Sequence, residues 1–191
     1  MAKMHWLEKL AVNSKLDYGF HKYFGFYKYL KTAKLPDSIK ILEIGSGIGI
    51  TSDFISKKFN ESILTATDFD ATQIETARNR KHNKNINFSQ EDATQLSFTS
   101  ESFDACFAIL TFHHIHNFTD AIKEIYRVLK TGGSLFIYDI PWKSYNLFSF
   151  WSNLGQTGSF TKDEFIRILK VNGFKIIKVK SGFNFWIEAK K

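Results

Sequence analysis

Cysteine, proline and long apolar runs are all scarce in this sequence of 191 residues. The single cysteine, Cys106, cannot form a disulfide within the chain, which is consistent with a reducing compartment. No stretch reaches the ~18 apolar residues of a membrane span, and the first ten residues lack the pattern of a signal peptide. With two prolines and 43% apolar residues, the sequence indicates one soluble, cytoplasmic globular domain without an integral membrane segment.

Arginine is also rare, and it occurs only at positions 78, 80, 127 and 167, although the net charge is +7. Most of the positive charge therefore comes from lysines scattered along the chain. Recognition of bases or phosphates with bidentate geometry favours arginine over lysine. We interpret the charge as solvated lysine and do not expect a nucleic acid partner, while the sequence leaves an oligomer open.

The most informative stretch runs from position 39 to position 49. Residues 39–44 are mostly β-branched or leucine, which is typical of a parallel strand covered on both faces, and Glu43 lies near its carboxyl end. Three glycines follow, at positions 45, 47 and 49. Glycines there allow positive φ angles and a close approach of backbone to a ligand. Open α/β sheets bind ligands at this end of their strands.

A strand followed by a glycine-rich turn is also found in dinucleotide-binding proteins. Their fingerprint, G-x-G-x-x-G counted from Gly45, requires glycine at position 50, where this chain has Ile50. A nicotinamide-dependent oxidoreductase is therefore the less favoured alternative.

Two further acids follow predicted strands. Asp68 lies 19 residues after Gly49, and an acid at about 20 residues is placed to accept hydrogen bonds from ribose hydroxyls. Asp70 fits the cap of the next helix better than Asp68 does, which leaves Asp68 for a ligand. Asp92 follows a short strand at 86–89 and is placed to accept from an exocyclic amino group such as that of adenine. An ordinary loop acid is the alternative for Asp92.

A group of histidines follows the fourth predicted strand, at positions 113, 114 and 116. The H-H-x-H spacing without nearby cysteines is not that of a recognised zinc or iron site, so no metal site is predicted. His113, just beyond the strand, is the best-placed general base, because histidine exchanges protons near neutral pH. A pocket-shaping role for His113 and His114 fits equally well. Asp139, at the end of the fifth strand, is a further candidate.

The remaining patterns predict helices and a terminal hairpin. Helices are expected over residues 51–58, 71–80, 120–130 and 161–170, with Gly132-Gly133 ending the third and Thr161 capping the fourth. Residues 173–189 read as an antiparallel hairpin. Aromatic residues at helical spacing over 15–30 predict an N-terminal helical cap within residues 1–38, ahead of a main domain at 39–191. Three roles are open for that helix: it covers the sheet, it closes over a pocket as a lid, or it lies on a membrane surface.

Taken together, the motifs form a recognisable set: E-x-G-x-G-x-G after strand one, acids after strands two and three, S-F-D before strand four, and R-V-L-K-T-G-G before strand five. This set resembles the class I S-adenosylmethionine-dependent methyltransferases, specifically the small-molecule group that includes the ubiquinone and menaquinone C-methyltransferases. The resemblance implies an α/β, Rossmann-like fold with a doubly wound seven-stranded sheet, an antiparallel last strand and three αβα layers. It also implies S-adenosylmethionine as cofactor and S-adenosylhomocysteine as product.

The same resemblance implies the cofactor contacts. Those of the methionine part belong to the glycine turn: Glu43, Gly45, Ser46, Gly47 and Gly49. Those of the adenosine part follow strands two and three, with Asp68 on the ribose, Phe69 beside it, and Asp92 and Ala93 on the adenine. Ala108 and Ile109 of strand four would contact the amino acid end.

Methyl transfer from a sulfonium is an in-line displacement, so alignment and exclusion of water supply most of the acceleration and a catalytic side chain is optional. Residues 109–112 lack the [N/D]-P-P-[Y/F] motif of enzymes that methylate nucleobase amines, and Cys106 is mid-strand rather than in a loop. The aromatic content of 15–30 and 141–160 suggests a small apolar or aromatic acceptor. We predict a methyltransferase acting on such a molecule; a non-catalytic S-adenosylmethionine-binding partner subunit is the alternative.

Overall fold

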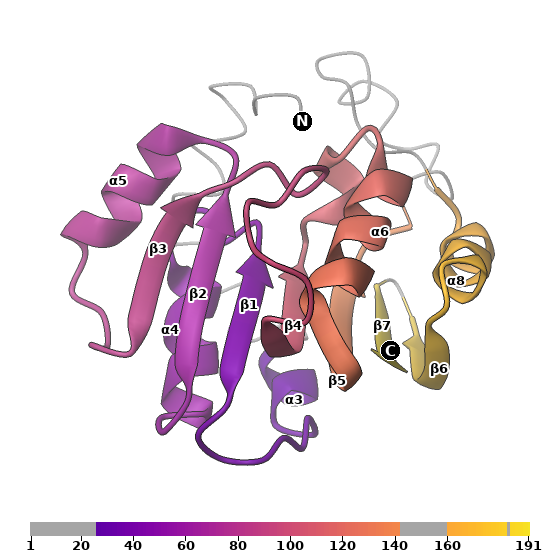
Figure 1. Cartoon of the computed structure of the whole chain (residues 1–191), viewed down its shortest axis with the longest axis horizontal. Helices are drawn as coiled ribbons and strands as arrows, with labels where there is room; N and C mark the ends of the chain where they lie inside the picture. The colour runs from indigo at the N-terminus through magenta and orange to yellow at the C-terminus, as the bar shows by residue number, and fades with distance from the viewer. Residues whose placement is uncertain (1–25, 142–159, 183) are drawn as a thin grey trace.

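The computed structural model describes residues 26–141, 160–182 and 184–191 (Figure 1). Most of the predicted N-terminal helix and the aromatic stretch after position 141 lie outside the described residues. Within the described ranges, no helix has both the length and the apolar character needed to cross a membrane.

A mixed sheet of seven strands, in the order β3-β2-β1-β4-β5-β7-β6, forms the centre of the described structure (Figure 1). The strands are β1 (Lys40–Ile44), β2 (Ile63–Asp68), β3 (Ile86–Gln90), β4 (Phe103–Ile109), β5 (Leu129–Asp139), β6 (Lys175–Ser181) and β7 (Phe185–Lys190). Strands β1 to β5 pair in parallel, and β7 runs antiparallel to both of its neighbours. This confirms the predicted doubly wound sheet with an antiparallel last strand.

Helices cover both faces of the sheet. They are α3 (Phe26–Leu30), α4 (Ile50–Lys58), α5 (Ala71–Asn79), α6 (Phe118–Val128) and α8 (Lys162–Val171), with a short 3-10 turn, η1, at Phe112–His114. Buried side chains of α3, α4 and α5 share one core with one sheet face, and those of α6 and α8 share a second core with the other. The predicted three-layer arrangement is therefore confirmed.

Burial on both faces explains the composition of β1. Leu42 and Ile44 pack in the core beneath α6 and α8, whereas Ile41 packs in the core beneath α3 to α5. Successive strand side chains point to opposite faces, so Glu43 points to the same face as Ile41. The one acid in this strand is thereby directed at the start of α4.

Several local predictions hold in the structure. Oδ1 of Asp70 accepts a 2.9 Å hydrogen bond from the Thr72 amide and caps α5. Thr161 and Glu164 form a capping box at the start of α8. In α3, Phe26 and Leu30 are buried on the sheet, and the Tyr29 ring stacks on Trp186 with centroids 5.5 Å apart. The described part of the N-terminal segment thus covers a face of the sheet.

The predicted end of the third helix was wrong. Helix α6 ends at Val128, and Gly132 and Gly133 lie inside β5. Leu129 already pairs with Phe103 of β4, and the register shifts before the next β4 residue pairs. The Gly132 amide donates to the carbonyl of Lys191, 3.0 Å away. The backbone groups that would have continued the helix therefore form hydrogen bonds outside it. The two glycines lie in the irregular first part of β5.

Candidate active site

The glycine turn after β1 and the acid that ends β2 meet at one rim of the sheet. The Gly47 amide donates a 2.8 Å hydrogen bond to Oδ2 of Asp68. Oδ1 of Asp68 accepts from the Asp70 amide at 2.9 Å. The Ser46 amide donates to the carbonyl of Thr67, also at 2.9 Å. The carboxylate of Asp68 thereby orders the turn that follows the neighbouring strand.

Two glycines of this turn are required for different reasons. At Gly45, where φ is +73°, a Cβ atom would lie 2.4 Å from Oγ1 of Thr111. Oγ1 of Thr111 donates to the carbonyls of Ile44 and Ile109, both 3.0 Å away, so it has little freedom to move. At Gly47, where φ is +53°, a Cβ atom would meet no atom of the described residues within 4 Å. Gly45 therefore permits close packing between the segments that follow β1 and β4, whereas Gly47 presents an open face.

Ser46 provides a polar group on this turn. Its side chain is 5% exposed, and its hydroxyl has no hydrogen-bond partner among the described residues. A buried hydroxyl without a partner carries a free-energy cost that a polar ligand relieves. Together with the open face of Gly47, this hydroxyl fits the amino acid end of an adenosyl amino acid. Gly49, the last residue of the turn, precedes α4 directly.

Glu43 lies near the end of β1, just before the glycine turn, and is fully buried. Its carboxylate accepts hydrogen bonds from the hydroxyls of Thr51 and Ser52 in the first turn of α4. Burial raises the pKa of Glu43 to about 7, although the hydrogen bonds from Ser52 and Thr51 act in the opposite direction. The structure thus places this predicted cofactor residue where it holds the start of α4 against β1.

Ala108 and Ile109 end β4 beside the turn. Both are buried, Ala108 in the core beneath α6 and α8 and Ile109 in the core beneath α3 to α5. Their side chains are committed to these two cores. Only their backbone groups are left to contact a ligand at the rim. The carbonyl of Ile109 already accepts a hydrogen bond from the Thr111 hydroxyl.

The residues predicted to surround an adenosine lie after β2 and β3. Phe69 is half-buried, and its carbonyl accepts a 3.1 Å hydrogen bond from Nε2 of Gln90. Oδ1 of Asp92 accepts from both the amide and the hydroxyl of Thr94, at 2.9 and 2.7 Å. Ala93 is buried in the core beneath α6. Asp92 thus shapes the loop that begins after β3.

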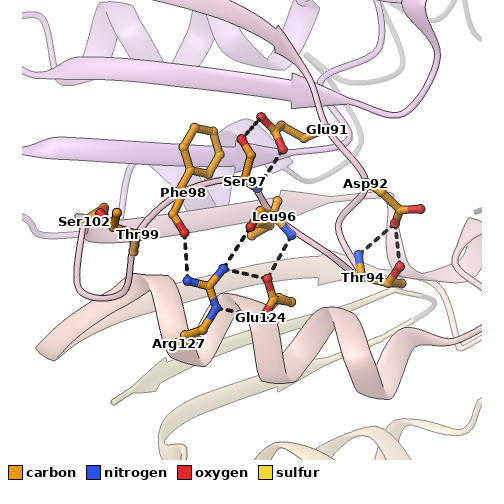
Figure 2. A network of polar contacts seen from close by, with 10 residues as sticks. All are labelled: Glu91, Asp92, Thr94, Leu96, Ser97, Phe98, Thr99, Ser102, Glu124 and Arg127. Atoms are coloured by element: carbon orange, nitrogen blue, oxygen red, sulfur yellow. Dashed lines mark hydrogen bonds and ion pairs between the residues drawn. The ribbon is translucent and has the colours of Figure 1, made fainter.

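An ion pair on α6 anchors that loop (Figure 2). Nη1 of Arg127 donates to the carbonyl of Phe98 at 2.7 Å, and Nη2 donates to the carbonyl of Leu96 at 2.9 Å. Oε2 of Glu124 accepts from the Leu96 amide at 2.9 Å and from Nη2 of Arg127 at 2.7 Å. Glu124 and Arg127 were not among the residues predicted from the sequence, although their i, i+3 spacing on a predicted helix was a usable signal.

His113 and Asp139 meet on the β4–β5 side of the rim. Nδ1 of His113 lies 2.5 Å from Oδ1 of Asp139, which is fully buried. Oδ2 of Asp139 accepts from the amides of Thr111 and Phe112, at 3.2 and 2.7 Å, and Oδ1 also accepts from the Ile140 amide at 2.7 Å. A carboxylate only accepts, so Nδ1 of His113 donates and Nε2 is the nitrogen able to take up a proton.

The backbone after β4 makes this contact possible. Leu110 adopts a φ of +51°, a conformation that is uncommon outside glycine, and its amide donates to the Tyr138 carbonyl at 2.7 Å. This turn brings His113 back to Asp139. The His114 ring lies with its centroid 3.9 Å from that of His113, and burial lowers the pKa of His114 well below its ordinary value. Among the described residues, no group of three or more potential ligand side chains could hold a metal ion.

Comparison with known proteins agrees with this geometry. Residues 42–137 match the methyltransferase domain family. Malonyl-[acyl-carrier protein] O-methyltransferase of Bacillus cereus is 34% identical over 108 residues, which cover 56% of this chain and 38% of the relative. The chloroplastic 2-methyl-6-phytyl-1,4-hydroquinone methyltransferase 2 of Oryza sativa subsp. japonica is 28% identical over 143 residues, which cover 74% of this chain and 40% of the relative.

A solved structure shares the whole described architecture. The crystal structure of a SAM-dependent methyltransferase from Aquifex aeolicus aligns with a TM-score of 0.80 over 98% of both chains, at 19% sequence identity. The fold is thus that of the class I, Rossmann-like methyltransferases. The chain belongs to the methyltransferase domain family, and within it to the class I S-adenosylmethionine-dependent methyltransferases. It spans about two fifths of the length of the curated relatives it matches.

Proposed function

We propose that this protein transfers the methyl group of S-adenosylmethionine to a small apolar or aromatic acceptor. The hydrogen bond from the Gly47 amide to the Asp68 carboxylate carries the proposal. It joins the glycine turn to the acid of the next strand at the carboxyl ends of β1 and β2, where open α/β sheets bind ligands. The open face of Gly47 lies on the same turn as the Ser46 hydroxyl, which has no hydrogen-bond partner in the described part of the chain.

Within this proposal, each part of the rim holds one part of the cofactor. Ser46 and Gly47 contact the amino acid end, Asp68 accepts from the ribose hydroxyls, and the loop beginning at Asp92 borders the adenine. The bound cofactor supplies an activated methyl group on a positively charged sulfur. The chain aligns the acceptor with it and excludes water, which is worth about 7–11 kcal/mol of the barrier.

For an acceptor that must lose a proton, we assign His113 as the general base. Asp139 holds the imidazole ring through Nδ1, so Nε2 receives the proton. General acid–base catalysis contributes about 10²- to 10⁴-fold, less than alignment does. Polar acceptors that need no deprotonation would be methylated without this pair.

The acceptor class rests on the relatives and on the sequence. The Oryza sativa relative is named for a phytylated hydroquinone, and the Bacillus cereus relative for a malonyl group on an acyl-carrier protein. The aromatic residues over 15–30 and 141–160 favour the first kind of acceptor. A nucleic acid is not favoured, because the side chains of Arg78, Arg80 and Arg127 all donate to backbone carbonyls of this chain. A non-catalytic subunit is not favoured either, because the rim carries a base held by a carboxylate.

Thermal shift measurement tests the cofactor. S-adenosylhomocysteine at 100 times its Kd is expected to add ~2.7 kcal/mol to the free energy of unfolding, or ~5–11 °C to Tm, whereas NADH adds nothing. A shift with NADH but none with S-adenosylhomocysteine would overturn the proposal. A panel of hydroquinones, phenols, fatty acids and polar amines, assayed with radiolabelled S-adenosylmethionine, then tests the acceptor. Turnover confined to the polar amines would contradict the apolar or aromatic class.

A further inference from the structure

Gln73, in the first turn of α5, is a buried amide without partners. Its side chain is 2% exposed, yet neither Nε2 nor Oε1 has a hydrogen-bond partner among the residues that the structure describes. The carboxamide offers two N–H donors and one carbonyl acceptor. Leaving such a group buried and unpaired costs free energy, and a ligand that pairs with it recovers that cost. Gln73 was not among the site residues predicted from the sequence.

The contacts of α5 show where this amide lies. Ala77, one helical turn after Gln73, packs against the glycine turn, because a Cβ atom on Gly49 would lie 3.4 Å from the Ala77 Cβ. Residues i and i+4 share one face of a helix, and their side chains tilt toward the helix N-terminus. Helix α5 starts directly after β2, at the same rim as Asp68 (Figure 1). Gln73 therefore lies on the face of α5 that packs on the glycine turn, one turn closer to the rim than Ala77.

Asp68 can satisfy only part of the hydrogen bonding of a ribose, and Gln73 can satisfy the rest. The carboxylate of Asp68 only accepts hydrogen bonds, so it pairs with the hydrogen atoms of ribose hydroxyls. The oxygen atoms of the same hydroxyls need a donor, and an amide N–H supplies one. Gln73 and Asp68 are five residues apart across the junction between β2 and α5.

We propose that Gln73 is a cofactor-binding residue whose carboxamide hydrogen-bonds the ribose of the bound adenosyl group beside Asp68. This inference rests on the proposed function. It makes Gln73 a binding residue rather than a structural one, so its replacement affects ligand affinity and folding stability in opposite directions.

The test compares Gln73→Leu with the unaltered protein by isothermal titration calorimetry and thermal unfolding. Leucine has a similar size and removes the unpaired amide. The expected result is a Kd for S-adenosylhomocysteine raised about 10-fold, with a ligand-free Tm that stays the same or rises. Glu75→Leu, which places leucine on the exposed side of the same helix, is expected to leave the Kd unchanged. A fall in Tm with an unchanged Kd would show a structural role and overturn the inference.

Two analogues of S-adenosylhomocysteine, lacking either the ribose 2′-hydroxyl or the 3′-hydroxyl, locate the contact. In the unaltered protein at least one of them binds more weakly than the parent, and in Gln73→Leu this difference shrinks severalfold. Equal losses in both proteins would place the amide against another part of the ligand and overturn the ribose assignment. If the unaltered protein does not bind S-adenosylhomocysteine at all, the proposed function fails together with the inference. If it binds and Gln73→Leu binds equally well, only the inference fails.

Discussion

Oδ1 of Asp139 in β5 lies 2.5 Å from Nδ1 of His113, which follows β4. The two residues are 26 positions apart in the sequence, and β4 and β5, the strands that lead to them, are parallel neighbours. Asp139 also accepts from two backbone amides of the segment that carries His113, so one buried carboxylate orients both the ring and its backbone.

Asp139→Asn tests this orientation. Asparagine keeps the shape, and its oxygen still accepts from the Thr111 and Phe112 amides, but its NH₂ group then faces Nδ1 of His113 and the Ile140 amide. The imidazole must therefore carry its proton on Nε2, which can no longer act as a base. For an acceptor that loses a proton, we expect kcat to fall ~10²- to 10⁴-fold, with the Kd of S-adenosylhomocysteine changed less than about threefold. His113→Gln serves as the matched variant, and retention of kcat in both would assign the pair to shaping the pocket.

Gly45→Ala and Gly47→Ala are expected to differ in their effects on folding stability and on ligand affinity. Both positions have positive φ angles, which cost alanine ~1–2 kcal/mol. At Gly45 the new methyl also overlaps Thr111, so we expect a further loss of ~1–3 kcal/mol in the free energy of unfolding. At Gly47 the methyl enters open space, so the stability loss is the smaller of the two while the affinity for S-adenosylhomocysteine falls more. Thermal unfolding and calorimetry on both variants measure the difference; equal losses of stability would contradict it.

The raised pKa of Glu43 predicts a pH dependence of stability. Burial raises this pKa from 4.5 to about 7, so between these values the folded state holds a proton that the unfolded state has released. The contribution of Glu43 is present below pH 4.5 and declines as the pH rises through about 7. We expect Glu43→Gln to gain ~3 kcal/mol relative to the unaltered protein across this window. Urea unfolding at several pH values measures it, and a constant difference would show that Glu43 is ionised throughout.

Arg127→Lys tests the anchoring of the loop after β3. Lysine keeps the charge but cannot donate to the carbonyls of Leu96 and Phe98 with the fork of a guanidinium. We expect faster hydrogen exchange at the Leu96 amide and a Kd for S-adenosylhomocysteine raised ~3- to 10-fold. Lys123→Ala removes an exposed ion pair on the same helix and serves as the control. Unchanged exchange in Arg127→Lys would mean that Glu124 alone holds the loop.

Much of the fold was predictable because its signals are local. Apolar β-branched runs, glycine turns and capping residues each depend on a few neighbouring positions, so the strands, most helix starts and the caps at Asp70 and Thr161 were predicted correctly. The end of α6 was not predicted correctly. Leu129 pairs with Phe103 on a strand distant in sequence, and this pairing overrides the local preference of Gly132 and Gly133 for ending a helix.

The candidate site divides in the same way. Sequence alone assigned the glycine turn, Asp68, Asp92 and His113 to one rim, because parallel strands place their carboxyl ends together, and their roles toward a cofactor stay predictions. Only the tertiary structure decided that Glu43 holds α4, that Asp139 orients His113, and that Gln73 is buried with no hydrogen-bond partner within residues 26–141, 160–182 and 184–191. These roles depend on which atoms of distant segments come within hydrogen-bonding distance. That outcome follows from the packing of helices on the sheet, which no single stretch of sequence specifies.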